Sequence, residues 1–494
     1  MKLLRRLAQI TFLLAFVALL LATTWPLRSP VPVRAFLSLD PLAALSVLLS
    51  PARSLTALRL FWPALALLAA TALLGRFFCG WVCPLGTCLD ATDTALKPLR
   101  RGRAAGAPGV KYLLLIALLA AAPFGVQLVW LLDPIPLLTR TFATALMPLG
   151  SAGYDAALQP LRSAGLRLQP LPVHPFTLSL LTGGALLAIV LLGLISRRYW
   201  CRSLCPLGAL LGLVGRWGRW RRRVTDNCRQ CRLCSRDCKM GAIPAEQPTS
   251  TRQAECLQCY DCLECCDPSG TQITLGANPQ SDPTVDVGRR EFLAACATGV
   301  AYGAIARYGL AKEPLSARLL RPPGAVVRSP DGALAGLMSE DEFLSKCLRC
   351  GQCMKACITG GLQPAVLEAG LLGFYTPRLV PRLGQCEQGC AACGQVCPSG
   401  ALVPFTVEEK KQIIIGEARI DRRRCLAWQA GSEYRQCLVC DEHCSYDAIQ
   451  TRSHMGEDRP FVEEQICTGC GICEKACPVK SEAAILVYGL GQGH

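Results

Sequence analysis

The spacing of the cysteines constrains this chain more than any other feature. Of its 494 residues, 31 are cysteine, and six groups of four account for most of them. The quartets are Cys228, Cys231, Cys234 and Cys238; Cys256, Cys259, Cys262 and Cys266; Cys347, Cys350, Cys353 and Cys357; Cys386, Cys390, Cys393 and Cys397; Cys425, Cys437, Cys440 and Cys444; and Cys467, Cys470, Cys473 and Cys477. Four quartets have the C-x2-C-x2-C-x3-C spacing of bacterial iron-sulfur ligands. In such a long chain this pattern predicts metal sites rather than a disulfide framework.

The same spacing predicts that the quartets work in pairs. Three thiolates two residues apart can surround one cluster, and the fourth reaches the neighbouring cluster. Six quartets then make three two-cluster modules, with six [4Fe-4S] clusters in all. In the first module we assign Cys228, Cys231, Cys234 and Cys266 to one cluster, and Cys256, Cys259, Cys262 and Cys238 to the other.

Some alternatives stay open at this point. Soft thiolates also suit zinc, although zinc ribbons pair two C-x2-C knuckles over a longer gap. Cys265 could replace its neighbour Cys266 as a ligand. An insertion containing Trp428 and Tyr434 precedes Cys437, so the fifth quartet departs from the regular spacing but still supplies four thiolates. The fourth quartet also departs from the regular spacing, because one extra residue separates Cys386 from Cys390.

Composition indicates a membrane. Hydrophobic residues make up 51% of the chain and charged residues only 18%, against about 25% charged in a soluble domain. Apolar stretches at residues 7–25, 55–75, 112–132 and 176–195 approach the length of a membrane-spanning helix, whereas the shorter run 41–50 suggests an interfacial or re-entrant piece. Basic residues flank these stretches and place the N-terminus in the cytoplasm. The net charge of +16 therefore reflects membrane topology and not nucleic-acid binding.

The chain divides into five regions on this basis. We expect an α-helical membrane domain of four spans (1–223), a cytoplasmic two-cluster α+β ferredoxin-like domain (224–287), a segment that begins with two arginines (288–310), a linker (311–338) and a four-cluster ferredoxin domain (339–494). The length of the apolar run after Arg289-Arg290 suits a twin-arginine export signal better than a full membrane span, although a fifth membrane segment stays open. The alternative is an amphipathic linker helix. Export would place the last domain in the periplasm.

A duplicated C-x3-C-P loop follows the second and fourth apolar stretches. One copy contains Cys79 and Cys83 and the other Cys201 and Cys205, each after two aromatic residues and before Leu-Gly. The charge rule puts both copies on the cytoplasmic side. The four thiols are either a redox-active or metal-binding site or buried cysteines at two helix ends.

These motifs resemble known families. The four-helix half with its C-x3-C-P loops and trailing ferredoxin resembles the NapH family of membrane ferredoxins, related to MauN and NosR. The half that begins Arg289-Arg290-Glu291-Phe292-Leu293 and carries four quartets resembles the exported ferredoxins NapG and MauM. The resemblance implies a protein of the bacterial inner membrane, an electron-transfer subunit rather than a stand-alone enzyme. It would pass electrons from the quinol pool to a periplasmic acceptor such as nitrate reductase or its cytochrome. The resemblance makes Cys79, Cys83, Cys201 and Cys205 the characteristic thiols.

Two other functional classes compete with this interpretation. Resemblance to MauM and MauN also implies a maturation factor that supplies electrons for inserting a cofactor or a metal such as copper into a periplasmic enzyme. A redox sensor is disfavoured because no output domain is recognisable. Neither a Walker phosphate loop nor a dinucleotide glycine fingerprint occurs, which argues against direct oxidation of NAD(P)H.

The six quartets make a prediction about metal content. Protein purified and reconstituted without oxygen should contain about 24 iron atoms and as much sulfide per chain, because each quartet serves four irons. Elemental analysis measures both. Stoichiometric zinc with little iron would contradict the cluster interpretation.

Overall fold

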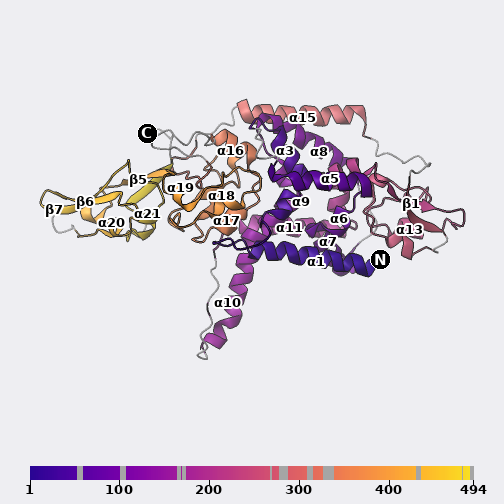
Figure 1. Ribbon diagram of the computed structural model, residues 1–494, viewed down its shortest axis with the longest axis horizontal. Coiled ribbons are helices and arrows are strands. Elements are labelled where there is room, and N and C mark those ends of the chain that lie inside the picture. Colours follow the sequence, from indigo (N-terminus) through magenta and orange to yellow (C-terminus); the bar gives the residue numbers. More distant parts are fainter. Residues whose placement is uncertain are drawn as a thin grey trace. The chain divides into compact units, whose positions relative to one another are not determined.

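The computed structural model describes residues 1–52, 59–100, 107–163, 169, 174–266, 270–276, 287–308, 315–325, 339–429, 435–480 and 482–489. The beginning of the second apolar stretch, the end of the first ferredoxin region, most of the expected linker and Tyr434 lie outside these residues. The chain forms two compact units, and each draws on separate parts of the sequence (Figure 1). Unit 1 contains Met1–Leu21, Ala35–Thr141 and Leu180–Ala304, and unit 2 contains Ala22–Arg34, Phe142–Ser179 and Ile305–His494.

Unit 1 is mainly helical. Its α-helices are α1 (Lys2–Leu21), α2 (Ala35–Ser38), α3 (Pro41–Leu49), α5 (Trp62–Leu74), α6 (Phe78–Trp81), α7 (Pro84–Leu96), α8 (Val110–Ala121), α9 (Pro134–Thr141), α11 (Ser179–Leu191), α12 (Pro206–Gly215), α13 (Leu233–Asp237), α14 (Asp261–Glu264) and most of α15 (Arg289–Tyr308), whose residues from Ile305 onward belong to unit 2. Short 3-10 or π turns are η1 (Lys97–Leu99), η2 (Ala122–Phe124), η3 (Val129–Leu131), η5 (Leu192–Leu194), η6 (Trp200–Leu204) and η7 (Gln253–Glu255). Strands β1 (Trp220–Val224) and β2 (Thr271–Leu275) pair antiparallel and enclose the first ferredoxin region.

All four expected apolar stretches contain helices, but the helices differ in length. Among the described residues, only α1 is both long and apolar enough to cross a membrane by itself. The other stretches hold shorter apolar helices, at Trp62–Leu74, Val110–Phe124 and Ser179–Leu194. The run 41–50 forms α3, because the Asp40 carboxylate caps it by accepting hydrogen bonds from the amides of Leu42 (3.0 Å) and Ala43 (3.3 Å).

The segment that begins with the two arginines forms a single helix, α15, which packs closely on α8. A Cβ atom placed on Gly299 would lie 2.3 Å from the carbonyl oxygen of Ala117, and one on Gly303 would lie 2.8 Å from the Phe124 ring. Two glycines four residues apart on one helix face let two helices approach closely, as they do in membranes. Residues 289–308 therefore form a helix docked on an apolar helix of unit 1.

Unit 2 combines short helices with three two-stranded sheets. Its helices are α10 (Met147–Ser163), α16 (Glu340–Lys346), α17 (Gln352–Ala356), α18 (Ala392–Val396), α19 (Val407–Lys410), α20 (Val439–Glu442) and α21 (Ile472–Ala476), with turns η4 (Phe142–Leu146), η8 (Leu371–Gly373) and η9 (Leu426–Trp428). The antiparallel pairs are β3 (Leu362–Pro364) with β4 (Pro377–Leu379), β5 (Gly416–Ile420) with β8 (Ile485–Gly489), and β6 (Ile449–His454) with β7 (Glu457–Val462). This mixed helix and strand content agrees with the expected ferredoxin-like regions. The helix α10, which the apolar pattern did not indicate, follows α9 through the π turn η4.

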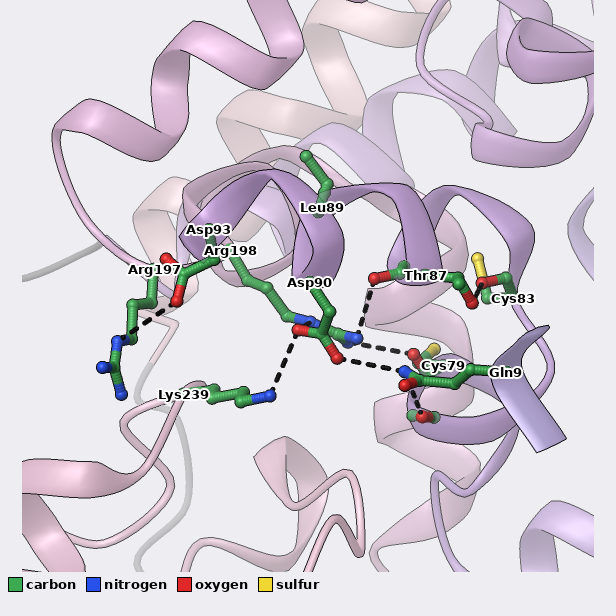
Figure 2. Close-up of polar contacts among 12 residues, drawn as sticks. Gln9, Cys79, Cys83, Thr87, Leu89, Asp90, Asp93, Arg197, Arg198 and Lys239 are labelled. Carbon is green, nitrogen blue, oxygen red and sulfur yellow. Dashed lines mark hydrogen bonds and ion pairs between the residues drawn. The ribbon is translucent and has the colours of Figure 1, made fainter. Parts of the chain in front are cut away.

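A buried ionic network ties unit 1 together around Asp90 of α7 (Figure 2). The Asp90 carboxylate accepts hydrogen bonds from Arg198 Nε (2.9 Å) and Gln9 Nε2 (3.0 Å), and it lies 3.4 Å from Lys239 Nζ. Burial alone would raise the pKa of Asp90, but the Arg198 and Lys239 cations outweigh burial and hold the pKa below its ordinary range. The network joins α1, α7 and the first ferredoxin region.

Replacing Asp90 with Asn should therefore destabilise unit 1. The change leaves the buried Arg198 guanidinium without its carboxylate, which costs about 3 kcal/mol. At neutral pH the wild type has this contribution, and it disappears only as the pH falls through the lowered pKa. Thermal unfolding of the purified full chain followed by circular dichroism measures the difference. Asp93→Asn is the matched control, because Asp93 pairs with the less buried Arg100 and Arg197 and should cost about 1 kcal/mol or less. Equal losses in both variants would contradict the assignment.

Candidate iron-sulfur sites

The cysteine loops share an unusual backbone. In four quartets, the residues directly before and after the second cysteine have positive φ angles. They are Gln230 and Arg232, Gln258 and Tyr260, Arg349 and Gly351, and Gly469 and Gly471. A left-handed conformation costs a residue with a side chain about 1–2 kcal/mol, so it persists only where the surrounding structure imposes it. The two turns fold the chain back around the second cysteine.

Four cavities show how the quartets combine. Each is lined by three cysteines of one quartet and the fourth cysteine of its partner. The cysteines are Cys256, Cys259, Cys262 and Cys238 around about 470 Å³; Cys347, Cys350, Cys353 and Cys397 around about 390 Å³; Cys386, Cys390, Cys393 and Cys357 around about 390 Å³; and Cys425, Cys437, Cys440 and Cys477 around about 350 Å³, open mouths included. The first set is the one expected from spacing. The irregular fourth and fifth quartets take part in the same exchange.

The two remaining sets of thiols interact electrostatically. Burial raises the pKa of Cys234, and the nearby Cys266 and Cys228 thiols act in the same direction. Burial likewise raises the pKa of Cys467, and the nearby Cys444 thiol raises it further. Cys265 also lies close enough to Cys234 for the two thiols to interact, so the structure brings both neighbouring cysteines to this set.

The fourth cysteines of several quartets accept backbone hydrogen bonds. The sulfur atoms of Cys238, Cys397, Cys444 and Cys477 accept from the amides of Ala242 (3.2 Å), Leu402 (3.3 Å), Ala448 (3.3 Å) and Ala484 (3.3 Å), respectively. Amide donors aimed at the sulfurs stabilise negative charge there and raise the reduction potential of a bound cluster. Sequence spacing placed these cysteines but did not identify their donors.

The donor set fits an iron-sulfur cluster. Burial raises the pKa of Cys256 to about 11 and that of Cys350 to about 12, so these thiols keep their protons at neutral pH unless a metal replaces them. Within the described ranges, no three Cys, His, Asp or Glu side chains converge closely enough to hold a single metal ion. The hollows between the thiols are instead large apolar cavities. A bound [4Fe-4S] cluster would supply one-electron redox chemistry at each of them.

The C-x3-C-P loops come together as an internally symmetric pair. All four thiols are buried. Burial raises the pKa of Cys83, and Cys79 and Cys201 raise it further, so thiols of both loops are neighbours. Sequence reasoning missed an arginine three residues before the first cysteine of each loop, although the repeat contains it in both copies.

Each of these arginines reaches into the other loop. Arg198 donates to the carbonyl oxygens of Cys79 (3.0 Å) and Gly86 (3.0 Å) (Figure 2). Arg76 Nη2 lies so close to Gly208 that a Cβ atom there would be 2.4 Å away. Gly208 is therefore needed because the partner loop's guanidinium occupies the space that a side chain would take. At Gly86 the space is taken instead by the Cys79 carbonyl oxygen of the same loop, which would lie 2.8 Å from a Cβ atom.

A buried glutamate links the thiol loops to the first ferredoxin region. Glu255, which directly precedes Cys256, pairs with Lys111 and Arg76 (3.2 Å to Nη1) and accepts a hydrogen bond from Tyr112 Oη (3.0 Å). All four side chains are buried. Spacing could not have revealed this cluster, because its partners come from segments far apart in the sequence.

Two segments of unit 2, residues 22–34 and 142–179, follow helices of unit 1 in the sequence and form hydrogen bonds with the C-terminal ferredoxin region. Arg34 Nη1 donates to the carbonyl oxygens of Gln395 (3.3 Å) and Cys397 (3.1 Å), and Gln352 Nε2 donates to that of Val33 (2.9 Å). Gln363 contacts the second loop through the Pro175 carbonyl oxygen (3.2 Å). We call 22–34 and 142–179 the outer loops.

Comparison with known proteins points to the same chemistry. A family model described as a 4Fe-4S binding domain matches residues 56–101 and 178–225, which contain the two C-x3-C-P loops, and a second 4Fe-4S model matches 458–479. The ferredoxin-type protein NapG of Escherichia coli is 34% identical over 236 residues, which cover 45% of this chain and 92% of NapG. MauM of Paracoccus denitrificans, a methylamine utilization ferredoxin-type protein, is 32% identical over 41% of this chain and 87% of its own length. The ferredoxin-type protein NapF of E. coli is 33% identical over 147 residues, which cover 29% of this chain and 79% of NapF. No solved structure matches.

The left-handed cysteine loops predict an unusual response to glycine. Arg232 and Arg229 are both exposed and lie in the same loop, but only Arg232 has a positive φ. Arg232→Gly removes the cost of the left-handed conformation, whereas both substitutions add the same entropy to the unfolded chain. The variant should therefore be more stable than Arg229→Gly by about 1 kcal/mol. Thermal loss of the cluster absorbance reports this difference. Equal stability of the two variants would contradict the strain assigned to the loop.

Proposed function

Because the chain belongs to the family of NapG- and MauM-type ferredoxin proteins, we propose that it is a membrane-bound protein passing electrons from the quinol pool to a periplasmic redox enzyme or cytochrome. The six cysteine sets would bind six [4Fe-4S] clusters, two on the cytoplasmic side and four on the periplasmic side. In this proposal the N-terminal half is a NapH-like membrane domain fused to the NapG-like part. A nitrate reductase-like system is the acceptor that the resemblance described under Sequence analysis implies.

The observation that carries the proposal is the distribution of loops between the two units. The charge rule puts the C-x3-C-P loops on the cytoplasmic side and the outer loops on the opposite side. The C-x3-C-P loops belong to unit 1 with the first ferredoxin region, and the outer loops belong to unit 2 with the C-terminal cysteine sets. The Arg34 and Gln352 hydrogen bonds fix that second association. This division supports clusters on both sides of a membrane.

In this proposal α15, which is not apolar enough to cross a membrane by itself, crosses between the two sides while packed on α8. Its 20 residues measure about 30 Å as an α-helix, the thickness of the hydrocarbon core. Arg289 and Arg290 precede the apolar part, as the positive-inside rule requires of a cytoplasmic end. The close contacts of Gly299 and Gly303 with α8 and η2 favour a retained membrane helix over a surface linker.

The paired thiol loops would connect quinol oxidation to the first module. Cys79, Cys201 and Cys205 lie close to Arg76, which pairs with Glu255, and Cys83 neighbours Cys79 and Cys201. Glu255 in turn adjoins Cys256 of the nearest cysteine set. We infer that these thiols form a redox-active site at the cytoplasmic end of the membrane helices. The match of the 4Fe-4S family model to both loops supports this role.

Protease accessibility tests the sidedness. If α15 carries the C-terminal half outward, protease added to right-side-out spheroplasts should cut the wild-type chain beyond residue 320. Replacing Arg289 and Arg290 with Lys should block export, because a twin-arginine address is read by a receptor, and should protect that region. The N-terminal cytoplasmic loops serve as the internal control and should be protected in both. Protection of the wild-type C-terminal half would place all six cysteine sets in the cytoplasm.

The similarity to MauM favours a second candidate, a maturation factor that supplies electrons for a cofactor or a metal centre of a periplasmic enzyme. Changing Cys83 and Cys205 to Ser separates the two functions. Under the leading proposal, the double variant keeps its iron but loses reduction of its clusters by a quinol analogue. Under the second, reduction by quinol persists while the partner enzyme loses its cofactor, and the wild-type thiols bind copper. Cys88→Ser, a nearby cysteine outside the C-x3-C-P pairs, is the control in both assays.

A further inference from the structure

Resting on the proposed electron-transfer function, we propose that the four C-terminal cysteine sets have a direction. Electrons arrive at the set Cys347, Cys350, Cys353 and Cys397, the receiving set. They leave from the set Cys425, Cys437, Cys440 and Cys477, the delivering set. Three observations carry this inference: the order of the sets in unit 2, the contacts of the receiving set with the outer loops, and the burial of the cysteines.

Hydrogen bonds and exchanged cysteines arrange the four sets in a line. Cys397 and Cys357 are exchanged between the receiving set and the set Cys386, Cys390, Cys393 and Cys357. The amide of Cys386 then donates to the carbonyl oxygen of Cys470 (2.8 Å), which joins this second set to Cys444, Cys467, Cys470 and Cys473. The last two quartets are adjacent because α20 contacts α21 and because Cys477 of the last quartet lines the cavity of Cys425, Cys437 and Cys440. Figure 1 shows the same order within this unit, from α17 and α18 through α21 to α20.

The receiving set lies against the segments that leave the membrane helices. Arg34 donates to the carbonyl oxygen of the ligand residue Cys397 itself, and Gln352, between Cys350 and Cys353, donates to Val33. The loop 22–34 starts directly after the last residue of α1. Near the same set, the Thr144 hydroxyl lies 2.8 Å from Tyr375 Oη, and Thr144 is three residues past the end of α9. Two chain segments thus connect this end of the line to the membrane helices.

Burial distinguishes the two ends. All four cysteines of the receiving set are buried, whereas three of the delivering set, Cys437, Cys440 and Cys477, are only partly buried. A redox group that hands electrons to a separate protein must approach the surface, and a group reached only from within the same chain need not. Trp428, which packs on the delivering set, lies beneath the guanidinium groups of Arg422 (4.1 Å) and Arg459 (5.2 Å).

The electron count is that of a one-electron chain. Oxidation of one quinol to quinone releases two electrons and two protons, and each cysteine set accommodates one electron at a time. With a cluster bound, the cysteines of the receiving set would hold a group that accepts one electron, and that electron would pass to the next set along the line. At the delivering set, the electron passes to the oxidised one-electron centre of the periplasmic partner.

Two ligand variants of the full chain test the direction. Cys350→Ala disables the receiving set and Cys440→Ala the delivering set, and each should lower the iron content from about 24 to about 20 atoms. Freeze-quench electron paramagnetic resonance after mixing with duroquinol follows the remaining C-terminal signals, and dithionite shows that they are present. We expect Cys350→Ala to abolish their reduction by duroquinol, and Cys440→Ala to leave it at the wild-type rate. The opposite pattern, or normal reduction in both, would overturn the proposal.

A second measurement does not depend on the donor. In fully reduced protein, the paramagnetic clusters of neighbouring sets are magnetically coupled. A variant that loses a set at one end of the line should change the signal of one neighbouring cluster. A variant at Cys386, which loses a set in the middle of the line, should change the signals of two. If duroquinol reduces no cluster in the wild type, the proposed donor is wrong. The coupling pattern still decides whether the receiving set is at an end, and two affected neighbours in Cys350→Ala would refute it.

Arg34→Gln provides a variant that keeps every cysteine. It removes the two hydrogen bonds to Gln395 and Cys397 and should slow the arrival of electrons at the C-terminal sets severalfold without changing their dithionite-reduced spectra. Arg28→Gln makes the same charge change at an exposed position of the same loop and should leave the rate unchanged. Equal rates in Arg34→Gln and the wild type would contradict the role given to the outer loop.

Discussion

The exchanged fourth cysteine is the constraint on which the rest of the structure depends. A loop with left-handed residues on both sides of its second cysteine turns back on itself, and the fourth cysteine then lines the hollow of a different loop. No quartet therefore completes a site alone. Quartets must fold in pairs, and the pairs give each ferredoxin region its compactness although its helices and sheets are short. The cysteine chemistry, and not a large hydrophobic core, organises these parts of the chain.

Buried charges organise unit 1 in a comparable way. Arg76 and Arg198 reach across the symmetric thiol loops, and each is compensated by a carboxylate, Glu255 or Asp90. Removing one partner of such a pair costs far more than the pair contributes, because an isolated charge remains away from water. The arginines, the thiols and the first ferredoxin region consequently behave as one polar junction. The junction also places Glu255, and with it Cys256 of the first ferredoxin region, next to the arginine of a thiol loop.

Segments that alternate along the sequence belong to two different units. In the proposed electron path, one unit would receive the electrons and the other would deliver them. Loops that alternate along the chain separate into different units, each with its own ferredoxin region. Such a division suits a protein that receives electrons on one side of a membrane and delivers them on the other. The relatives NapG, MauM and NapF match only 29–45% of this chain, so more than half of the chain lies outside the part that each of them matches.

The sequence by itself determined the chemistry of the sites, because ligand spacing is a local property: 24 cysteines in quartets, the exchange within the first module and the duplicated thiol loops can be read from residue intervals. It also indicated where apolar helices occur. Tertiary structure alone decided which distant residues meet. The pairing of the irregular fourth and fifth quartets, the Glu255 cluster, and the contacts of Arg34 with the receiving set join positions separated by up to several hundred residues. Such contacts depend on how whole segments pack, and no interval along the chain encodes them. Helix α10 escaped prediction because its sequence carries no apolar run.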